Sequence, residues 1–162
     1  MKWCCAVSRE EAGRDAVTDA AERLLAQLGA QPDLILAFIS PEHASQAVSV
    51  AGEISQRFPE ATVLGCSAGG LVSENEELEQ VPGMVLTGAL LPGVDLHPVR
   101  FDAGDAGDAG DGGQDAPDWS KLGAGTAGPT VGLMLLSDPF SCDPERLVAA
   151  LDVQFPDVIK FG

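Results

Sequence analysis

The chain has 162 residues, of which 45% are hydrophobic, and its 25 acidic and 9 basic residues give a formal net charge of -16 at pH 7. This length and apolar content suffice for one buried core, and the length fits a single domain. The strong negative charge repels phosphate backbones and anionic lipid surfaces, which argues against nucleic-acid and membrane-surface binding. No apolar run approaches the roughly 20 residues of a membrane span, and the apolar stretch near Met1 is too short for a secretory signal. We therefore expect a cytoplasmic protein.

The first predicted elements are a strand and a helix. Residues 2–7 (KWCCAV) predict a short strand, and Ser8 followed by Glu11 has the spacing of a capping box, which predicts a helix start. Gly29 would end that helix. Its apolar positions recur at helical spacing and predict one buried stripe, made of Ala16, Val17, Ala20, Ala21, Leu24, Leu25 and Leu28.

A second strand and helix follow. The continuous apolar run of residues 33–40 (DLILAFIS) predicts a strand that is buried on both faces. Ser40 and Pro41 then supply an N-cap and a proline in the first turn of a helix that ends before Pro59. We expect this helix to bury Ala44, Ala47, Val48, Ala51, Ile54 and Phe58. Residues 61–66 (ATVLGC) predict a third strand.

The middle of the chain contains a predicted acidic loop and a glycine-rich segment. After the loop SENEELEQVPG, two strand-like runs over residues 83–91 and 94–101 flank Pro92 and Gly93, which predicts an antiparallel hairpin. The segment of about 102–128 is rich in Asp, Ala and Gly and has too few large apolar side chains to fold alone. We expect a flexible surface insertion there.

The last part of the chain predicts strand, helix and strand again. The strands are expected over residues 130–138 and 157–162, and the helix from Pro144 to about Val153, entered through Asp143. The whole order is βαβαβ, then ββ, then βαβ. It predicts an α/β fold in which helices pack on a mixed β-sheet.

The motif GCSAGG follows the third strand and is the main candidate for chemistry. Its letters fit G-x-S-x-G, the nucleophile elbow of hydrolases, but that motif needs a helix directly afterwards and an acid and a histidine further on. The acidic loop follows instead, and nothing places His97, near Asp95, against Ser67. We rank a turn that binds a ligand first, a structural turn close behind and a catalytic elbow third. The residues of the motif are Gly65, Cys66, Ser67, Ala68, Gly69 and Gly70.

Two strand ends are expected to form one site. Ligands of α/β proteins gather beyond the carboxyl ends of strands, and both Ser40 and the GCSAGG motif follow strands directly. If the strands are parallel neighbours, the turns lie side by side. Backbone N–H groups of the glycine turn would then hold a carboxylate, and the Ser67 hydroxyl would donate a hydrogen bond. His43 would join this site or make a local cap interaction, and Cys66 would point into the core.

Other motif-like patterns do not point to chemistry. The letters G-x-G-x-x-G at 123–128 lack the preceding strand and following helix of a dinucleotide site. The aspartate repeat of the insertion lacks the ligand order of an EF-hand. No cysteine spacing fits zinc, so we expect free thiols, no metal and no cofactor. The aspartates are Asp102, Asp105, Asp108 and Asp111, and the cysteines are Cys4, Cys5, Cys66 and Cys142.

The segments DLILAFISPEH, GCSAGG, the acidic loop after it and LLPGV together resemble the N-terminal FIST domain, an intracellular sensory domain of signalling proteins that is also found in an F-box protein. The resemblance covers residues 1–101 well, and the later segments fit the order of the family. It implies a noncatalytic sensor of small ligands such as amino acids, normally followed by a C-terminal FIST domain. The insertion after Phe101 is long for the family, and the chain stops at Gly162, where the family continues. The resemblance therefore implies a truncated N-terminal portion.

We expect a cytoplasmic sensory module of signal transduction that binds an amino acid or a small carboxylate. One alternative is a noncatalytic protein-interaction scaffold, in which the acidic insertion and the exposed sheet bind a partner. Another is an enzyme, either a serine hydrolase that uses Ser67 or a Cys66-dependent activity.

Overall fold

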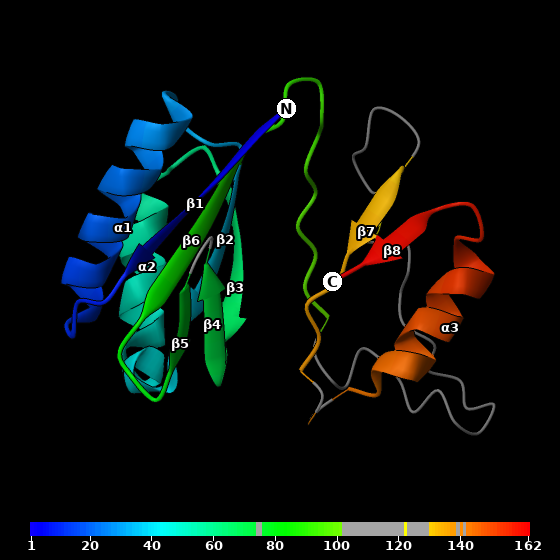
Figure 1. Cartoon of the computed structure of the whole chain (residues 1–162). Coiled ribbons are helices and arrows are strands. Elements are labelled where there is room, and N and C mark those ends of the chain that lie inside the picture. The colour runs from blue at the N-terminus through cyan, green and yellow to red at the C-terminus, as the bar shows by residue number, and fades with distance from the viewer. Residues whose placement is uncertain (74–75, 102–121, 123–129, 139, 141) are drawn as a thin grey trace. The chain divides into compact units, whose positions relative to one another are not determined.

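The computed structural model describes residues 1–73, 76–101, 122, 130–138, 140 and 142–162. Its helices and strands form a mixed α/β structure, as predicted (Figure 1). The chain divides into two compact units, Met1–Val94 and Asp95–Gly162. Apart from Leu122, the predicted insertion at about 102–128 lies outside the described residues, and so do the aspartate repeat and the pattern at 123–128.

The first unit is built on a mixed four-stranded sheet. Its strands are β1 (Lys2–Ser8), β2 (Leu34–Ile39), β3 (Thr62–Ser67) and β6 (Met84–Leu90), in the spatial order β1-β6-β2-β3. Strand β6 is antiparallel to both of its neighbours, whereas β2 and β3 are parallel. The mixed sheet predicted from the order of elements is confirmed.

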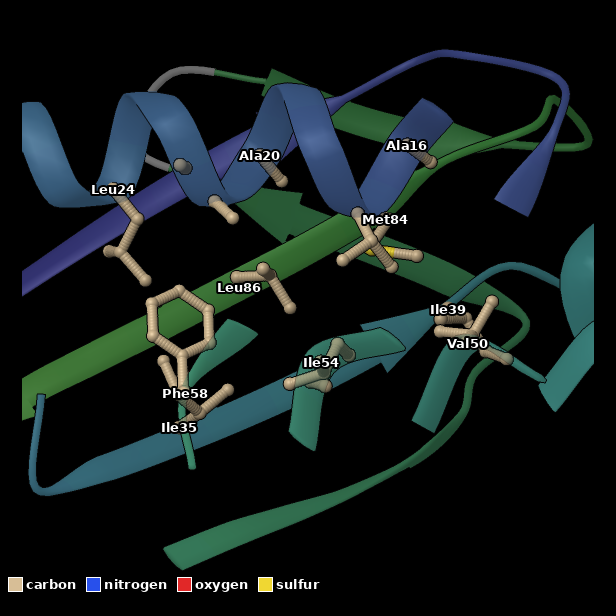
Figure 2. Packing of buried hydrophobic residues seen from close by; sticks show 14 of the residues in the cluster. Ala16, Ala20, Leu24, Ile35, Ile39, Val50, Ile54, Phe58, Met84 and Leu86 are labelled. Atoms are coloured by element: carbon tan, nitrogen blue, oxygen red, sulfur yellow. The ribbon is translucent and has the colours of Figure 1, made fainter. Parts of the chain in front are cut away.

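Two helices, α1 (Gly13–Leu28) and α2 (Ala47–Arg57), cover one face of this sheet (Figure 1). The predicted stripe of α1 is buried except at Leu25, which is partly exposed. Gly29 ends the helix with a φ of 78°, the left-handed conformation that favours glycine at this position. The stripe packs with side chains of β2, β6 and α2 in one hydrophobic cluster (Figure 2).

The predicted capping box at the start of α1 is wrong. Ser8 is buried as the last residue of β1, and the N-cap position of the helix is occupied by Ala12, four residues beyond the predicted N-cap. Alanine offers no side-chain acceptor. The first helical N–H, that of Gly13, is instead satisfied from a distant segment, because it donates to Oε1 of Gln46 at 3.0 Å.

The predicted buried stripe of the second helix is only partly correct. A 3-10 segment, η1 (Pro41–Gln46), precedes α2, and the buried row of the helix is Val50, Ile54 and Phe58. The side chain of Val48 is 91% exposed, and Ala44 and Ala51 are exposed too. Two positions correspond to about 200° around an α-helix, so burial of Val50 turns Val48 outwards.

The opposite face of the sheet carries a hairpin that the sequence pattern does not predict. Strands β4 (Gly70–Ser73) and β5 (Glu76–Glu79) are antiparallel, and Leu71 pairs with Leu78. Both leucines are buried in a small second cluster with Val85 of β6. The segment that the sequence predicts to be an acidic loop therefore supplies an apolar cover for part of the sheet.

The predicted hairpin over residues 83–101 is wrong. Its first half is β6, which pairs with β1 and β2 instead of with the following segment. The second half, residues 94–101, is fully described and forms no strand.

The second unit contains β7 (Gly132–Met134), α3 (Pro144–Gln154) and β8 (Ile159–Phe161). Strands β7 and β8 are parallel, as the predicted order strand, helix, strand requires. Asp143 caps α3 as predicted, since its carboxylate accepts from the N–H of Glu145 at 3.0 Å. Within the described part of the chain, no helix is both long and apolar enough to cross a membrane.

Candidate functional site

The carboxyl ends of β2 and β3 lie side by side, as the candidate site requires. The strands are parallel neighbours, and Ile39 at the end of β2 is in register with Ser67 at the end of β3. The N–H of Ala68 donates to the carbonyl oxygen of Ile39 at 2.9 Å, which continues the pairing one residue further. Ser40 and the second half of the GCSAGG motif therefore leave the sheet at the same end.

The GCSAGG motif is not the glycine turn that the sequence predicted. Gly65, Cys66 and Ser67 belong to β3, and Gly70 already begins β4. A concave anion nest needs a residue with positive φ, and none of the motif residues has one. A nucleophile elbow needs a helix after the serine, whereas a strand follows here.

Gly65 has a clear structural role in β3. A Cβ atom at this position would lie 2.0 Å from the carbonyl oxygen of Ala37 in β2 and 2.9 Å from its carbonyl carbon. Real Cβ atoms do not approach backbone atoms this closely, so the two strands can keep this spacing only around a glycine.

Ser67 and Cys66 are the exposed residues of the motif that carry reactive side chains. Burial of Cys66 in the core was predicted and is wrong, because β3 is an edge strand whose last three residues are exposed. Among the described residues, the Ser67 hydroxyl has no hydrogen-bond partner. It is therefore available to a ligand.

The backbone of β3 also presents donors at this edge. The N–H of Thr62 donates to the carbonyl oxygen of Asp33, directly before β2, and the N–H of Ala68 donates to that of Ile39 in β2. Backbone groups alternate in direction along a strand, so the N–H groups of Gly65 and Ser67 point away from β2. In the described sheet no strand lies on that side of β3. The end of β3 thus offers two N–H donors and one hydroxyl along an open edge.

Ser40 directly follows β2, beside the end of β3, but it is buried. Its Oγ accepts from the N–H of Gly83 at 3.1 Å, and its own N–H donates to the Gly83 carbonyl oxygen at 2.9 Å. Ser40 occupies the N-cap position of η1, but its side chain makes no cap hydrogen bond. Its hydroxyl instead holds the segment that leads into β6.

We expect Ser40→Ala to destabilise the fold, because the Gly83 N–H would lose its partner in a buried place. Such an unsatisfied donor costs about 1–3 kcal/mol. Urea denaturation measures the change, with Ser45→Ala at an exposed position of η1 as the matched control. Equal unfolding free energies for the two variants would contradict this role of Ser40.

His43 is also buried, with no exposed surface. Its Nδ1 lies 3.1 Å from the carbonyl oxygen of Gly83, and its Nε2 lies 3.0 Å and 3.1 Å from the carbonyl oxygens of Glu10 and Glu11. The ring therefore joins η1 to the segment after β1 and to the segment before β6. Both its nitrogens are occupied by backbone groups.

Glu42 is an exposed acid at this end of the sheet, and its ionisation is shifted. Hydrogen bonds from its own backbone N–H and from the Ser40 side chain lower the pKa of the Glu42 carboxyl, and attraction to His43 contributes in the same direction. The negative charge of Glu42 is thus favoured beside the buried ring.

A small pocket of about 150 Å³ lies at the opposite edge of the sheet, beside β1, and was not predicted. Arg23 and Gln27 of α1 line it and donate to the carbonyl oxygens of Val7 and Cys5 at 3.3 Å and 3.0 Å. Their spacing of four residues on one helix face is the signal that could have indicated it. These contacts cover the backbone of an edge strand, which protects it from pairing.

Metal ligands are not gathered in the described parts of the chain, where no group of three or more His, Cys, Asp or Glu residues could hold an ion.

The model of the FIST N domain matches residues 33–162, which include β2, β3 and the whole candidate site. FIST domains are sensory domains of signal transduction. No curated protein matches the chain.

Proposed function

Because the chain belongs to the FIST N domain family, we propose that it is a noncatalytic cytoplasmic sensory module whose ligand is an amino acid or another small carboxylate. The observation that supports this most directly is the exposed Ser67 hydroxyl, which has no partner among the described residues and lies at the carboxyl end of β3. Ligands of α/β sheets bind beyond such strand ends.

In this proposal a carboxylate accepts hydrogen bonds from the Ser67 hydroxyl and from the N–H groups of Ser67 and Gly65. Cys66, Ala68, Gly69 and Gly70 border the ligand. The polar side-chain atoms of Ser40 and His43 already contact the backbone of Gly83, so these residues do not contact the ligand. They support the site indirectly by holding Gly83 in place. Their contribution is to keep the strand ends in register with the segment before β6.

A catalytic role for Ser67 finds little support in the geometry. A serine nucleophile needs a base within hydrogen-bond reach. His43 is fully buried and both its ring nitrogens contact backbone carbonyl oxygens, so it is not available as that base.

We expect Ser67→Ala to weaken ligand binding by about tenfold or more, since a hydrogen bond to a charged group contributes roughly 1.5–3 kcal/mol. The unfolding free energy should change by less than about 0.5 kcal/mol, because the side chain is exposed and unpaired. Thermal-shift measurements against amino acids and small carboxylates check both expectations. A ligand at 100 times its dissociation constant stabilises the native state by about 2.7 kcal/mol.

The matched control for this experiment is Ser45→Ala, another exposed serine outside the site. A ligand that stabilises the parent chain and both variants equally would remove Ser67 from the site. Covalent labelling of Ser67 by a fluorophosphonate would contradict the noncatalytic assignment, because an ordinary serine hydroxyl is a weak nucleophile.

The second candidate function is a protein-interaction scaffold, and the open edge of β3 is the observation that favours it. An edge strand with free N–H and C=O groups can pair with a strand of another protein. In a longer protein, a C-terminal FIST domain is the partner that we propose for this module. Folded protein that responds to no small carboxylate, but whose β3 amides become protected when a partner binds, would favour the scaffold.

A further inference from the structure

The two outer strands of the four-stranded sheet differ in how their free edges are protected. Strand β1 forms one edge of the sheet and β3 forms the other. Along β1, the side chains of Gln27 and Arg23 donate to the carbonyl oxygens of Cys5 and Val7 at 3.0 Å and 3.3 Å. An additional strand would need these same carbonyl oxygens. The edge of β1 is therefore closed to pairing by side chains of α1.

The edge of β3 has no comparable protection. Its sequence TVLGCS contains neither a charged residue nor a proline, which are common devices that block an edge strand. The N–H of Ala68 donates to Ile39 of β2, and the direction of backbone groups alternates, so Val63, Gly65 and Ser67 point theirs outward. Within the described residues nothing pairs with these groups. Each of the three residues thus offers one free N–H donor and one free carbonyl acceptor.

The side chains along β3 also leave room for another strand. Gly65 has no side chain and lies in the middle of the edge, so nothing there obstructs a neighbouring backbone. Val63 and Leu64 are only partly buried. Side chains of neighbouring strands that share a face pack against each other, and β-branched residues suit this position best. A strand with an apolar, β-branched centre would therefore complete the burial of Val63 and Leu64.

Exposed carboxylates flank β3 in the chain. Glu60 lies just before the strand, and Glu79 of β5 is in register with Gly70, which follows the strand after two residues. The nearby cation Arg57 is paired with Glu22 at 3.3 Å. The formal net charge of -16 adds a general repulsion toward acidic partners, and a second copy of the chain is one of them. The charges therefore favour a partner that is basic on both sides of its pairing segment.

We propose that the outer edge of β3 pairs with an extended segment of another protein, which is apolar and β-branched at its centre and carries Lys or Arg on both sides. This inference rests on the second candidate function above and specifies the chemistry of the partner's strand. Backbone hydrogen bonds to Val63, Gly65 and Ser67 hold the segment, and its flanking cations select it over acidic strands.

The direct test is NMR titration of the full chain with a synthetic peptide in which alternating threonine and valine residues are flanked by lysines. We expect saturable shifts of the amide signals of Val63, Gly65 and Ser67, together with slower hydrogen exchange at these amides. The same peptide flanked by glutamates should bind at least about tenfold more weakly at low salt. Absence of saturable shifts at millimolar peptide would overturn the proposal. Slow exchange at these amides before any peptide is added would also overturn it, because the edge would already be paired.

Two variants of Ser67 separate this proposal from the carboxylate site. Ser67→Pro removes an outward N–H that no described residue accepts, and proline is tolerated on edge strands. It should weaken binding of the lysine-flanked peptide by about tenfold or more, whereas Ser67→Ala keeps the N–H and should bind the peptide as the parent chain does. A folded Ser67→Pro chain with parental peptide affinity would overturn the proposal. If Ser67→Pro does not fold, the titration of the parent chain decides.

The two variants also keep the failures of the two proposals apart. Ser67→Ala removes the hydroxyl that the carboxylate site uses, but strand pairing does not use it. Small carboxylates that stabilise the parent chain and Ser67→Ala equally would contradict the carboxylate site and leave strand pairing standing. Loss of peptide binding in Ser67→Ala would show that the peptide contacts the hydroxyl instead of the backbone edge, and would overturn strand pairing.

Discussion

Phe58→Ala is expected to lower the unfolding free energy by about 3–5 kcal/mol, the range for removal of a large aromatic side chain from a core. Phe58 is 1% exposed and is the largest fully buried side chain of the described residues. Figure 2 shows its ring within the main cluster, with Leu24, Ile35 and Leu86 around it. Because these neighbours come from α1, β2 and β6, the cavity would reach three elements at once. The unfolding free energy of a native protein is only about 5–15 kcal/mol in total, so this single change would remove a large part of it.

Urea denaturation measures this effect, and Val48→Ala is the matched control. Val48 was predicted to belong to the same buried face of the helix, but its side chain is 91% exposed. Its truncation should change the unfolding free energy by less than about 0.5 kcal/mol. A Val48→Ala chain as destabilised as Phe58→Ala would show that the helix packs with the face that the sequence predicted.

The sequence predicts elements well where apolar residues are large and continuous. The runs that became β2, β3 and β6 leave few alternatives, because each must be buried on at least one face. The second helix shows the limit of the pattern. Alanine is small enough to tolerate either environment, so Ala44 and Ala51 carry little information about the buried face. The 3-10 segment also delays the start of α2 to Ala47, which the sequence pattern does not reveal.

The missed β4–β5 hairpin has a different cause. Each strand buries one leucine, Leu71 or Leu78, and its other residues are exposed or partly exposed. Strand alternation over four residues gives one or two apolar positions, which is also what an acidic loop shows. Only the pairing of Leu71 with Leu78 makes the segment a sheet cover. That pairing is tertiary information.

At the candidate site, the sequence predicts which segments come together, but it does not predict the roles of their residues. The parallel alignment of β2 and β3 could be anticipated from two strands joined by a helix. Burial of Ser40 and His43 could not be anticipated, because their partner Gly83 lies about 40 residues away in the sequence. The contacts are to its backbone, and the amino-acid sequence does not show which backbone groups will be partners. The need for glycine at position 65 likewise depends on Ala37 of another strand.

Gly65→Ala is expected to lower the unfolding free energy by about 3 kcal/mol, the upper part of the usual range for overpacking a core. The new Cβ would lie 2.0 Å from the backbone oxygen of Ala37. A side chain could rotate away from such a contact, but a backbone carbonyl in a parallel ladder cannot. β2 and β3 would have to separate, which would also disrupt the edge where Ser67 is exposed.

Gly69→Ala, within the same motif, is the matched control for this change. A Cβ at Gly69 would meet nothing within 4 Å, and its φ is not positive. We therefore expect the unfolding free energy to change by less than about 0.5 kcal/mol. Comparison of the two variants separates the two roles that a glycine-rich motif can have. A loss confined to Gly65→Ala means that this glycine serves the close packing of two strands. Equal losses would instead mean that the backbone of the whole motif needs glycine, as an anion-binding glycine turn requires.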